Sequence, residues 1–283
     1  MRVAMAQITA GTDPAANLEL LAERVALAAD GGADLVVFPE ATMCRFGVPL
    51  RGIAQPLDGP WAAGVRDVAR QHGIAVVAGM FTPGSDDTAN ARVRNTVVVA
   101  DREGALSGYD KIHLYDAFGF AESATVEAGS SALVVDLPLA DGTSTRLGVA
   151  TCYDIRFPEL FGVLADAGAE VIAVPTSWGA GPGKVEQWRT LTAARALDSG
   201  AYVVAVDQAP PPDGGQQAPT GIGRSRLIDP FGSVVDDEYG ESPALGVHTI
   251  DPARVATARE ALGMRANRRD FAHPGGPTTP SDR

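Results

Sequence analysis

The sequence predicts an α/β fold in which two sheets stack face to face and helices cover both outer faces, an α-β-β-α sandwich over residues 1–265. Short apolar runs alternate with amphipathic helical patterns along the chain, which is typical of sheets with helical layers. The chain also repeats itself once, so each half is expected to supply one sheet and one helical layer. Residues 266–283 are polar and proline-rich, and we interpret them as a tail that is either frayed or reaches a partner subunit.

The first half contains clear helix boundaries. Asp13 before Pro14 is a capping residue followed by a first-turn proline, and it predicts a helix over 14–30 that ends at Gly31-Gly32. A second helix is predicted over about 61–72. The strands expected in this half are 2–8, 33–38, 74–80, 96–100 and 106–111, the last two forming a hairpin.

The second half follows a long irregular segment, 112–131. Loops of that length in compact domains are usually functional. The strands expected here are 133–137, 146–151, 171–174, 202–206, 226–229, 233–236 and 246–250, and the helices are 158–167, 184–199 and 252–262. Polar or Pro/Gly-rich loops are expected at 85–90 and 210–220.

The internal repeat rests on short matches that occur in the same order in both halves. The matching pairs are 3–7 with 148–152, 32–40 with 168–176, 73–78 with 200–205, and 101–104 with 229–232. Because corresponding segments should occupy corresponding places in two similar sheets, the carboxyl ends of the strands in each half are where a ligand site is expected.

Composition excludes several classes of function. The formal net charge is −12 and the pI is about 4.7, without a run of basic residues, which argues against a nucleic acid or an anionic membrane as partner. No apolar stretch is long enough to span a bilayer, and two cysteines without an export signal favour a reduced, cytoplasmic setting. The four histidines are scattered, so neither a metal nor another cofactor is expected.

Three chemically reactive side chains follow predicted strands. Cys152 ends a strand just before a helix that starts near Pro158, Glu40 follows a strand of the first half, and Lys111 ends the hairpin. A thiol attacks well only as a thiolate, so Glu40 can accept its proton while Lys111 favours the thiolate and then the oxyanion. The backbone N–H of Tyr153 would be a second oxyanion donor.

Each of these residues also has a plain structural interpretation. Cys152 could be a small buried hydrophobe, Glu40 a helix cap and Lys111 a surface residue. Lys111 is one of only two lysines, with Lys184, among 23 basic residues, which suggests a need for a compact ammonium. A second carboxylate in the long loop, Glu122 or Glu127, could orient Lys111.

At this point the sequence resembles the nitrilase superfamily of carbon–nitrogen hydrolases. The resemblance covers residues 1 to about 272 and is strongest at Phe38-Pro39-Glu40, at Tyr109-Asp110-Lys111-Ile112-His113-Leu114, and at Cys152-Tyr153-Asp154-Ile155-Arg156-Phe157-Pro158-Glu159. It implies the same α-β-β-α fold, assembly as a homodimer or higher homo-oligomer, and the roles of general base for Glu40, oxyanion lysine for Lys111 and nucleophile for Cys152. By the same resemblance Glu122, in Phe120-Ala121-Glu122-Ser123, is preferred to Glu127 as the second glutamate.

The resemblance also indicates a branch of that superfamily. Tyr153-Asp154 stands where true nitrilases typically have Trp-Glu, which favours amide hydrolysis similar to that of ω-amidases and deaminated-glutathione amidases. An N-carbamoyl hydrolase and a nitrilase stay open as alternatives. Arg224 departs from the family, whose members often have His before Ser225, and residues 207–220 are peculiar to this chain.

Substrate contacts are less constrained by the sequence. Trp178, Tyr153 and Phe118 are the candidates for lining the pocket, with further residues expected from the loops 41–58 and 207–220, and Arg45 is a candidate for binding a substrate carboxylate. Arg156 and Lys184 are further candidates for binding a substrate carboxylate. Two alternatives to an enzyme remain. One is a catalytically silent module that binds a metabolite or partner, and the other is a redox-sensing thiol protein, which would require Cys44 to approach Cys152.

Overall fold

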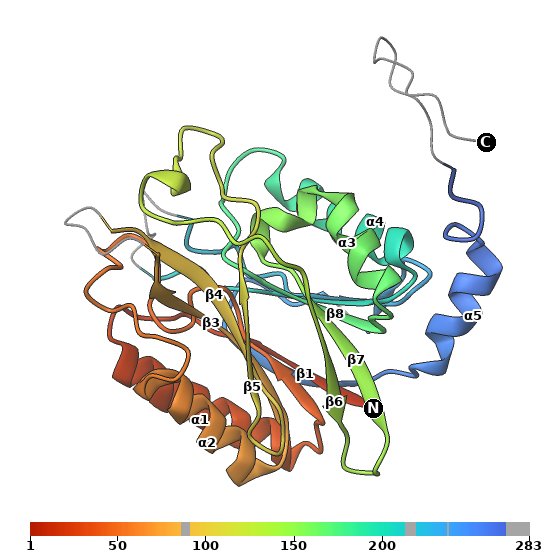
Figure 1. Ribbon diagram of the computed structural model, residues 1–283, viewed down its shortest axis with the longest axis horizontal. Helices are drawn as coiled ribbons and strands as arrows, with labels where there is room; N and C mark the ends of the chain where they lie inside the picture. Colours follow the sequence, from red (N-terminus) through yellow and green to blue (C-terminus); the bar gives the residue numbers. More distant parts are fainter. Residues whose placement is uncertain (86–90, 213–218, 237, 270–283) are drawn as a thin grey trace, which may run out of the picture.

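Two sheets form the centre of the computed structural model, which describes residues 1–85, 91–212, 219–236 and 238–269. In that part of the chain each sheet has six strands, in the orders β12-β1-β2-β3-β4-β5 and β11-β10-β9-β8-β7-β6. Figure 1 shows α1 and α2 on the outer side of one sheet and α3 and α4 on the outer side of the other. The predicted α-β-β-α sandwich is therefore confirmed.

The elements of the first half agree closely with the pattern of the sequence. They are β1 (Arg2–Gln7), α1 (Pro14–Asp30), β2 (Leu35–Val37), α2 (Pro60–His72), β3 (Ala75–Pro83), β4 (Val93–Ala100), β5 (Leu106–Asp110) and the short 3-10 helix η1 (Glu122–Ala124). Asp13 caps α1 by accepting a hydrogen bond from the backbone N–H of Ala15 at 2.9 Å. Strand β4 begins earlier than predicted, because its pairing with β3 continues to Pro83.

The second half contains one element that the sequence analysis did not predict. Its elements are β6 (Leu133–Pro138), β7 (Ser144–Val149), the 3-10 helix η2 (Cys152–Arg156), α3 (Pro158–Asp166), β8 (Val171–Thr176), α4 (Lys184–Ser199), β9 (Tyr202–Asp207), β10 (Arg226–Ile228), β11 (Val234–Val235), β12 (Ala244–Thr249) and α5 (Ala253–Leu262). The unexpected element is η2, which lies where a tight turn between strand and helix was predicted.

The two sheets have the same internal topology. In each, three parallel strands, β1-β2-β3 or β7-β8-β9, are followed by an antiparallel pair, β4-β5 or β10-β11. Each first parallel strand also has an antiparallel neighbour, β12 beside β1 and β6 beside β7. The last strand of the chain therefore returns to the sheet of the first half, and the sequence repeat is a repeat of structure.

The core follows the alternation of side chains along each strand. Val3 and Met5 of β1 belong to the cluster between the sheets, whereas Ala4 and Ala6 pack with residues of α1 and α2. The second sheet packs on α3 and α4 in the same way, through residues such as Leu164 and Trp188. Because both faces of the parallel strands are buried, their carboxyl ends are the accessible edge of the sheets.

Some predictions fall outside the described residues. Most of the polar loop at 85–90, part of the loop at 210–220, and residues 270–283 of the predicted tail are among them. The start of the tail is described, and Arg265 and Arg268 form ion pairs with Asp166. Among the residues that the structure describes, none of the helices has the length and apolarity that a membrane span requires.

Candidate active site

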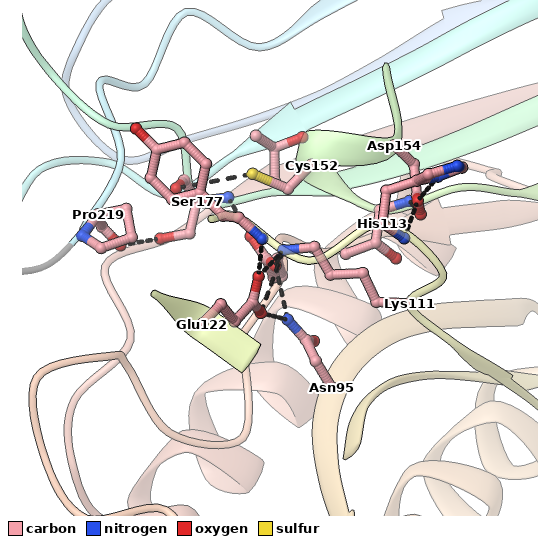
Figure 2. A network of polar contacts seen from close by, with 12 residues as sticks. Asn95, Lys111, His113, Glu122, Cys152, Asp154, Ser177 and Pro219 are labelled. Atoms are coloured by element: carbon pink, nitrogen blue, oxygen red, sulfur yellow. Dashed lines mark hydrogen bonds and ion pairs between the residues drawn. The ribbon is translucent and has the colours of Figure 1, made fainter. Parts of the chain in front are cut away.

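Glu40, Lys111 and Cys152 line one cavity at the carboxyl ends of the strands, which is where the sequence analysis expected them to meet. Figure 2 shows the polar contacts of Lys111, Glu122 and Asn95 close to Cys152. Lys111 Nζ lies 2.9 Å from Glu40 Oε1, although the two residues are 71 positions apart in the chain. The Lys111 side chain is only 2% exposed, so it is not the surface residue that a lysine usually is. Cys152 lines the same cavity, and its Sγ lies 3.9 Å from the carbonyl oxygen of Ser177.

The Glu40 carboxylate is fixed by hydrogen bonds from several elements. Besides Lys111, Asn95 Nδ2 donates to Oε1 at 2.7 Å and the backbone N–H of Ser177 donates to Oε2 at 2.9 Å. The Glu40 backbone is held as well, because Gln208 Nε2 donates to its carbonyl oxygen at 3.0 Å. These contacts hold the carboxylate in one orientation. A general base has to be positioned in this way to accept a proton from a neighbouring thiol.

Glu122 is the second carboxylate that contacts Lys111. Lys111 Nζ is 2.9 Å from Glu122 Oε2 and 3.2 Å from Oε1, and Asn95 Nδ2 donates to Oε1 at 3.1 Å. The backbone N–H of Tyr115 donates to Oε2 at 2.7 Å. Glu127, the alternative from the sequence, instead pairs with Arg94 at 2.7 Å and accepts from the backbone N–H of Ser85.

Cys152 has a backbone conformation that is rare for a side-chain-bearing residue. Its φ of 45° lies in the left-handed region, at the point where the chain leaves β7 and enters η2. At the start of a helical turn, the first backbone N–H groups have no acceptor within the helix. The N–H of Tyr153, the second residue of η2, is one of these donors, and it is therefore suited to bind an oxyanion.

Asp154 joins the nucleophile segment to the loop that carries Lys111. Its fully buried carboxylate accepts hydrogen bonds from the Thr151 N–H at 2.9 Å and from the Tyr109 hydroxyl at 2.7 Å. It also accepts the His113 N–H at 2.9 Å and contacts His113 Nδ1 at 2.7 Å. Because Lys111 lies between Tyr109 and His113 in the chain, Asp154 fixes Cys152 and Lys111 relative to each other.

Electrostatics couple the three reactive groups. Burial raises the pKa of the Cys152 thiol well above its usual value, the Glu40 carboxylate raises it further, and the Lys111 ammonium lowers it. Burial also raises the pKa of Glu40, which Lys111 opposes and Glu122 reinforces. Burial alone would lower the pKa of Lys111, but the Glu122 and Glu40 carboxylates raise it well above normal. These shifts favour a neutral thiol on Cys152 and a charged ammonium on Lys111, and they make the Glu40 carboxylate a stronger base than an ordinary glutamate.

A cavity of about 320 Å³ opens above these residues, a size suited to a small organic molecule. Its walls come from the loop at 46–51, from the long loop through Tyr115 and Phe120, and from Trp178. Trp178 lines the cavity as predicted, and its indole N–H donates to the Lys184 carbonyl oxygen at 3.0 Å. Lys184 and Arg156 line the cavity too.

Two predicted substrate-binding residues do not line this cavity. Arg45 is not among the residues that line the cavity, and its backbone N–H donates to the Gly11 carbonyl oxygen at 2.9 Å. Phe118 is 65% exposed and lies over Lys184 at the outer side, so Phe120 takes the predicted aromatic position. A substrate-binding role for Arg45 and Phe118 stays a prediction.

Cys44 is buried but contacts the carbonyl oxygen of Thr12 at 3.5 Å, and it does not line the cavity. Both cysteines are free thiols. Cys44 thus occupies a core position, and its geometry gives no support to a redox pair with Cys152.

Sequence reasoning missed the positioning roles of three residues. The sequence analysis assigned no role to Asn95, yet its one amide nitrogen bridges Glu40 and Glu122. Asp154 was used only to choose a branch, although Thr151-x-x-Asp154 is a capping-box pattern that predicts a fixed turn. Ser177 had no signal, because its backbone N–H is the group that contacts Glu40.

The chain is similar to several known proteins. The family model described as carbon–nitrogen hydrolase matches residues 2–260. A protein described only as a hydrolase from Mycobacterium tuberculosis is 52% identical over 280 residues, which is 96% of either chain. The deaminated glutathione amidase of Escherichia coli O157:H7 is 35% identical over 262 residues, covering 91% of this chain and 93% of that protein.

Solved structures agree with these similarities. Saccharomyces cerevisiae Nit3, a member of branch 10 of the nitrilase superfamily, has a TM-score of 0.80 at 26% identity, over 95% of this chain and 97% of that one. The amidase from Nesterenkonia sp. AN1, in a variant showing Michael addition of acrylamide at its active-site cysteine, has a TM-score of 0.72 at 27% identity. That match covers 94% of this chain and 99% of the amidase chain.

Proposed function

Since the chain belongs to the carbon–nitrogen hydrolase family and hydrolyses amides, we propose that it converts a small linear amide to a carboxylic acid and ammonia through a thioester on Cys152. In this proposal Glu40 is the base, Lys111 binds the oxyanion and Cys152 is the nucleophile, and one observation supports these three roles. A single ammonium, Lys111 Nζ, contacts Glu40 and Glu122 at 2.9 Å each within the cavity that Cys152 lines. A base, an oxyanion-binding cation and a nucleophile are thereby combined at one end of a ligand-sized cavity.

In the first step, the Cys152 sulfur attacks the amide carbonyl carbon while Glu40 takes the thiol proton. The raised pKa of Glu40, caused by its burial, suits this role, because a carboxylate with an ordinary pKa would be too weak a base for a buried thiol. The C–S bond forms and the carbonyl oxygen becomes an oxyanion. The Lys111 ammonium and the Tyr153 N–H stabilise this charge.

In the second step, the tetrahedral intermediate collapses and its C–N bond breaks. Glu40 returns the proton to the leaving nitrogen, so ammonia departs and the acyl group stays on Cys152 as a thioester. Glu40 then deprotonates a water that attacks the thioester carbon. The C–S bond breaks, the carboxylic acid is released, and the proton on Glu40 restores the thiol.

Glu122 acts through Lys111 in this scheme. Its carboxylate accepts hydrogen bonds from Lys111 Nζ and from the Tyr115 N–H, which keeps the ammonium charged and in place. We assign Glu122 the role of a positioning residue rather than of a second base.

The substrates we propose first are ω-amides and deaminated glutathione, the compound named for relatives that are 31–35% identical to this chain. Nitriles and N-carbamoyl amino acids are the enzymatic alternatives. A silent binding module is disfavoured, because the base, the lysine and the thiol are all present in one cavity. We also propose that residues 1–265 act as one domain, that the chain works as a cytoplasmic homodimer, and that it needs no cofactor.

The decisive experiment measures release of ammonia or amine from a panel of ω-amides, deaminated glutathione, nitriles and N-carbamoyl amino acids. Cys152→Ala is the test variant, and Cys44→Ala is the matched control, since Cys44 is a buried free thiol outside the cavity. Activity on one amide class that is lost in Cys152→Ala and kept in Cys44→Ala is expected. Full activity of Cys152→Ala would overturn the proposed nucleophile, and carbon dioxide as an additional product would indicate a ureido substrate.

A further inference from the structure

Lys184 is a cavity residue that the amide-hydrolysis scheme does not use. It is the first residue of α4, it is 7% exposed, and it lines the cavity on the side of Phe118. Apart from Lys111 it is the only lysine in the chain. A lysine held in a cavity wall at that level of burial requires a physical explanation, because lysine is almost never buried without a partner.

The partners of the Lys184 ammonium are aromatic and neutral. Its Nζ lies 3.7 Å from the centre of the Phe118 ring and 5.6 Å from those of Tyr115 and Trp178, and it is 3.5 Å from the Tyr115 hydroxyl. No carboxylate among the described residues forms an ion pair with it. The rings stabilise the cation but leave its charge uncompensated.

A second cation increases this imbalance. Arg156 lines the same cavity, where its Nη2 donates to the neutral Gln187 side chain at 2.7 Å and its buried Nε has no hydrogen-bond partner within the described residues. Burial lowers the pKa of Lys184, and repulsion from Arg156 lowers it further. Two positive groups in a wall of aromatic rings favour an anion between them, because each is partly desolvated and unpaired.

The location of Lys184 indicates which part of a ligand would reach it. The reacting carbonyl has to lie at Cys152 and Lys111, whereas the Lys184 ammonium packs on Phe118, an exposed ring at the outer side of the cavity. An anion at Lys184 therefore belongs to the end of the substrate that is remote from the amide.

We propose that Lys184 is a specificity-determining residue, which binds a carboxylate at the end of the amide substrate remote from the bond that is hydrolysed. The inference rests on the proposed amidase function and adds to it the residue that distinguishes an amide with a second, ionised carboxyl group from a neutral amide. Neutral amides of the same length would enter the cavity but would leave Lys184 without a counter-ion.

The test compares substrates that differ only in this charge. The pairs are succinamate, glutaramate and adipamate, each against its own methyl ester, with ammonia release measured for the wild type, Lys184→Met, Lys184→Arg and Arg189→Met. Arg189→Met is the matched control, since it removes one positive charge from an exposed residue of α4 that pairs with Glu238 outside the cavity. The ester assay also reports whether each variant is folded and active.

For the carboxylate of best length, Lys184→Met is expected to lower kcat/KM by about 10- to 100-fold, mainly through KM, which is the effect of losing one charge-assisted hydrogen bond. Its activity on the ester should be unchanged. Lys184→Arg should keep most of the preference for the carboxylate, and Arg189→Met should keep all of it. Equal losses on acid and ester, or no loss on the acid, would overturn the proposal.

A binding measurement separates this inference from the proposed function. Calorimetry with succinate, glutarate and adipate, the product acids, tests the same contact without turnover. If the wild type hydrolyses none of the amides but binds one diacid at least tenfold more tightly than Lys184→Met does, the proposed function fails and the role of Lys184 stands. If amides are hydrolysed and the variant binds the diacids as tightly as the wild type, only the role of Lys184 fails.

Discussion

Replacing Glu122 by glutamine tests how the site sets its own acidity. In the wild type the Glu122 charge raises the pKa of Glu40, while both carboxylates contact Lys111. Glutamine preserves the shape of the side chain but removes the charge. Glu40 should then have a lower pKa and be a weaker base.

The structure sets the size of the effect. The Asn95 amide nitrogen lies 2.7 Å from Glu40 Oε1 and 3.1 Å from Glu122 Oε1, so these two oxygens are within about 6 Å of each other. At an effective dielectric constant of about 20, two unit charges that far apart repel each other by about 3 kcal/mol. The Lys111 ammonium also loses one charged hydrogen bond, worth about 1.5–3 kcal/mol. We expect kcat/KM at the optimum to fall by about 10- to 150-fold.

The pH dependence distinguishes this explanation from a simple loss of structure. Glu40 must be ionised to accept the thiol proton, so kcat/KM rises with pH through the pKa of Glu40. Because Glu122 raises that pKa, Glu122→Gln should move the acidic limb of the profile to lower pH. The assay is ammonia release from the best amide across the pH range, with thermal unfolding measured in parallel.

Glu127→Gln is the matched control, since it makes the same change in the same loop but at a carboxylate that pairs with Arg94. It should leave the acidic limb where it is in the wild type. The reasoning is refuted if the limb of Glu122→Gln stays in place or moves to higher pH, or if both variants give the same profile.

Three further changes test the framework of the site. Asp154→Asn places an amide where four hydrogen bonds converge on a buried carboxylate, and it should lower the free energy of unfolding in urea by about 2–4 kcal/mol. An unchanged midpoint of urea unfolding would contradict the role of Asp154 in holding the two segments together. The rate at which iodoacetamide alkylates Cys152 should keep increasing as pH rises above neutral, because burial raises the pKa of this thiol. Lys111→Met should lower this rate at each pH. A rate that is already constant below neutral pH would argue for a preformed thiolate. Gly79→Ala would place a Cβ against the backbone nitrogen of Ala41, next to the proposed base, and should lower the free energy of unfolding by about 1–3 kcal/mol and reduce kcat. A fully active variant with an unchanged thermal unfolding midpoint would show that this loop can shift freely.

The sequence anticipated the fold because its signals are local and agree with one another. Caps such as Asp13 and turns such as 101–104 fix where elements begin and end, and the repeated order of segments implies two equivalent sheets. The pairing of β12 with β1 was not anticipated, because it joins residues about 245 positions apart and no local pattern specifies such a partner.

The same division applies to the site. Glu40, Lys111 and Cys152 could be found because each follows a strand, and strand ends of an α/β sheet gather at one edge. The choice between Glu122 and Glu127 came from a family resemblance, and the geometry that distinguishes them depends on the path of the long loop. Phe118 and Arg45 are absent from the lining of the cavity for the same reason: loop backbones follow tertiary hydrogen bonds, which sequence periodicity does not describe.

By itself, then, the sequence determined the sandwich of two repeated halves and the family to which the chain belongs, and it placed Glu40, Lys111 and Cys152 at strand ends. It could do so because strand and helix periodicity, caps and ordered motifs are properties of neighbouring residues. Only the tertiary structure decided that Asn95 bridges two carboxylates, that Asp154 joins the nucleophile to the lysine loop, and that Lys184 lies in the cavity with aromatic rings around its charge. These facts depend on distances between residues far apart in the chain, and such distances are set when the two sheets pack together.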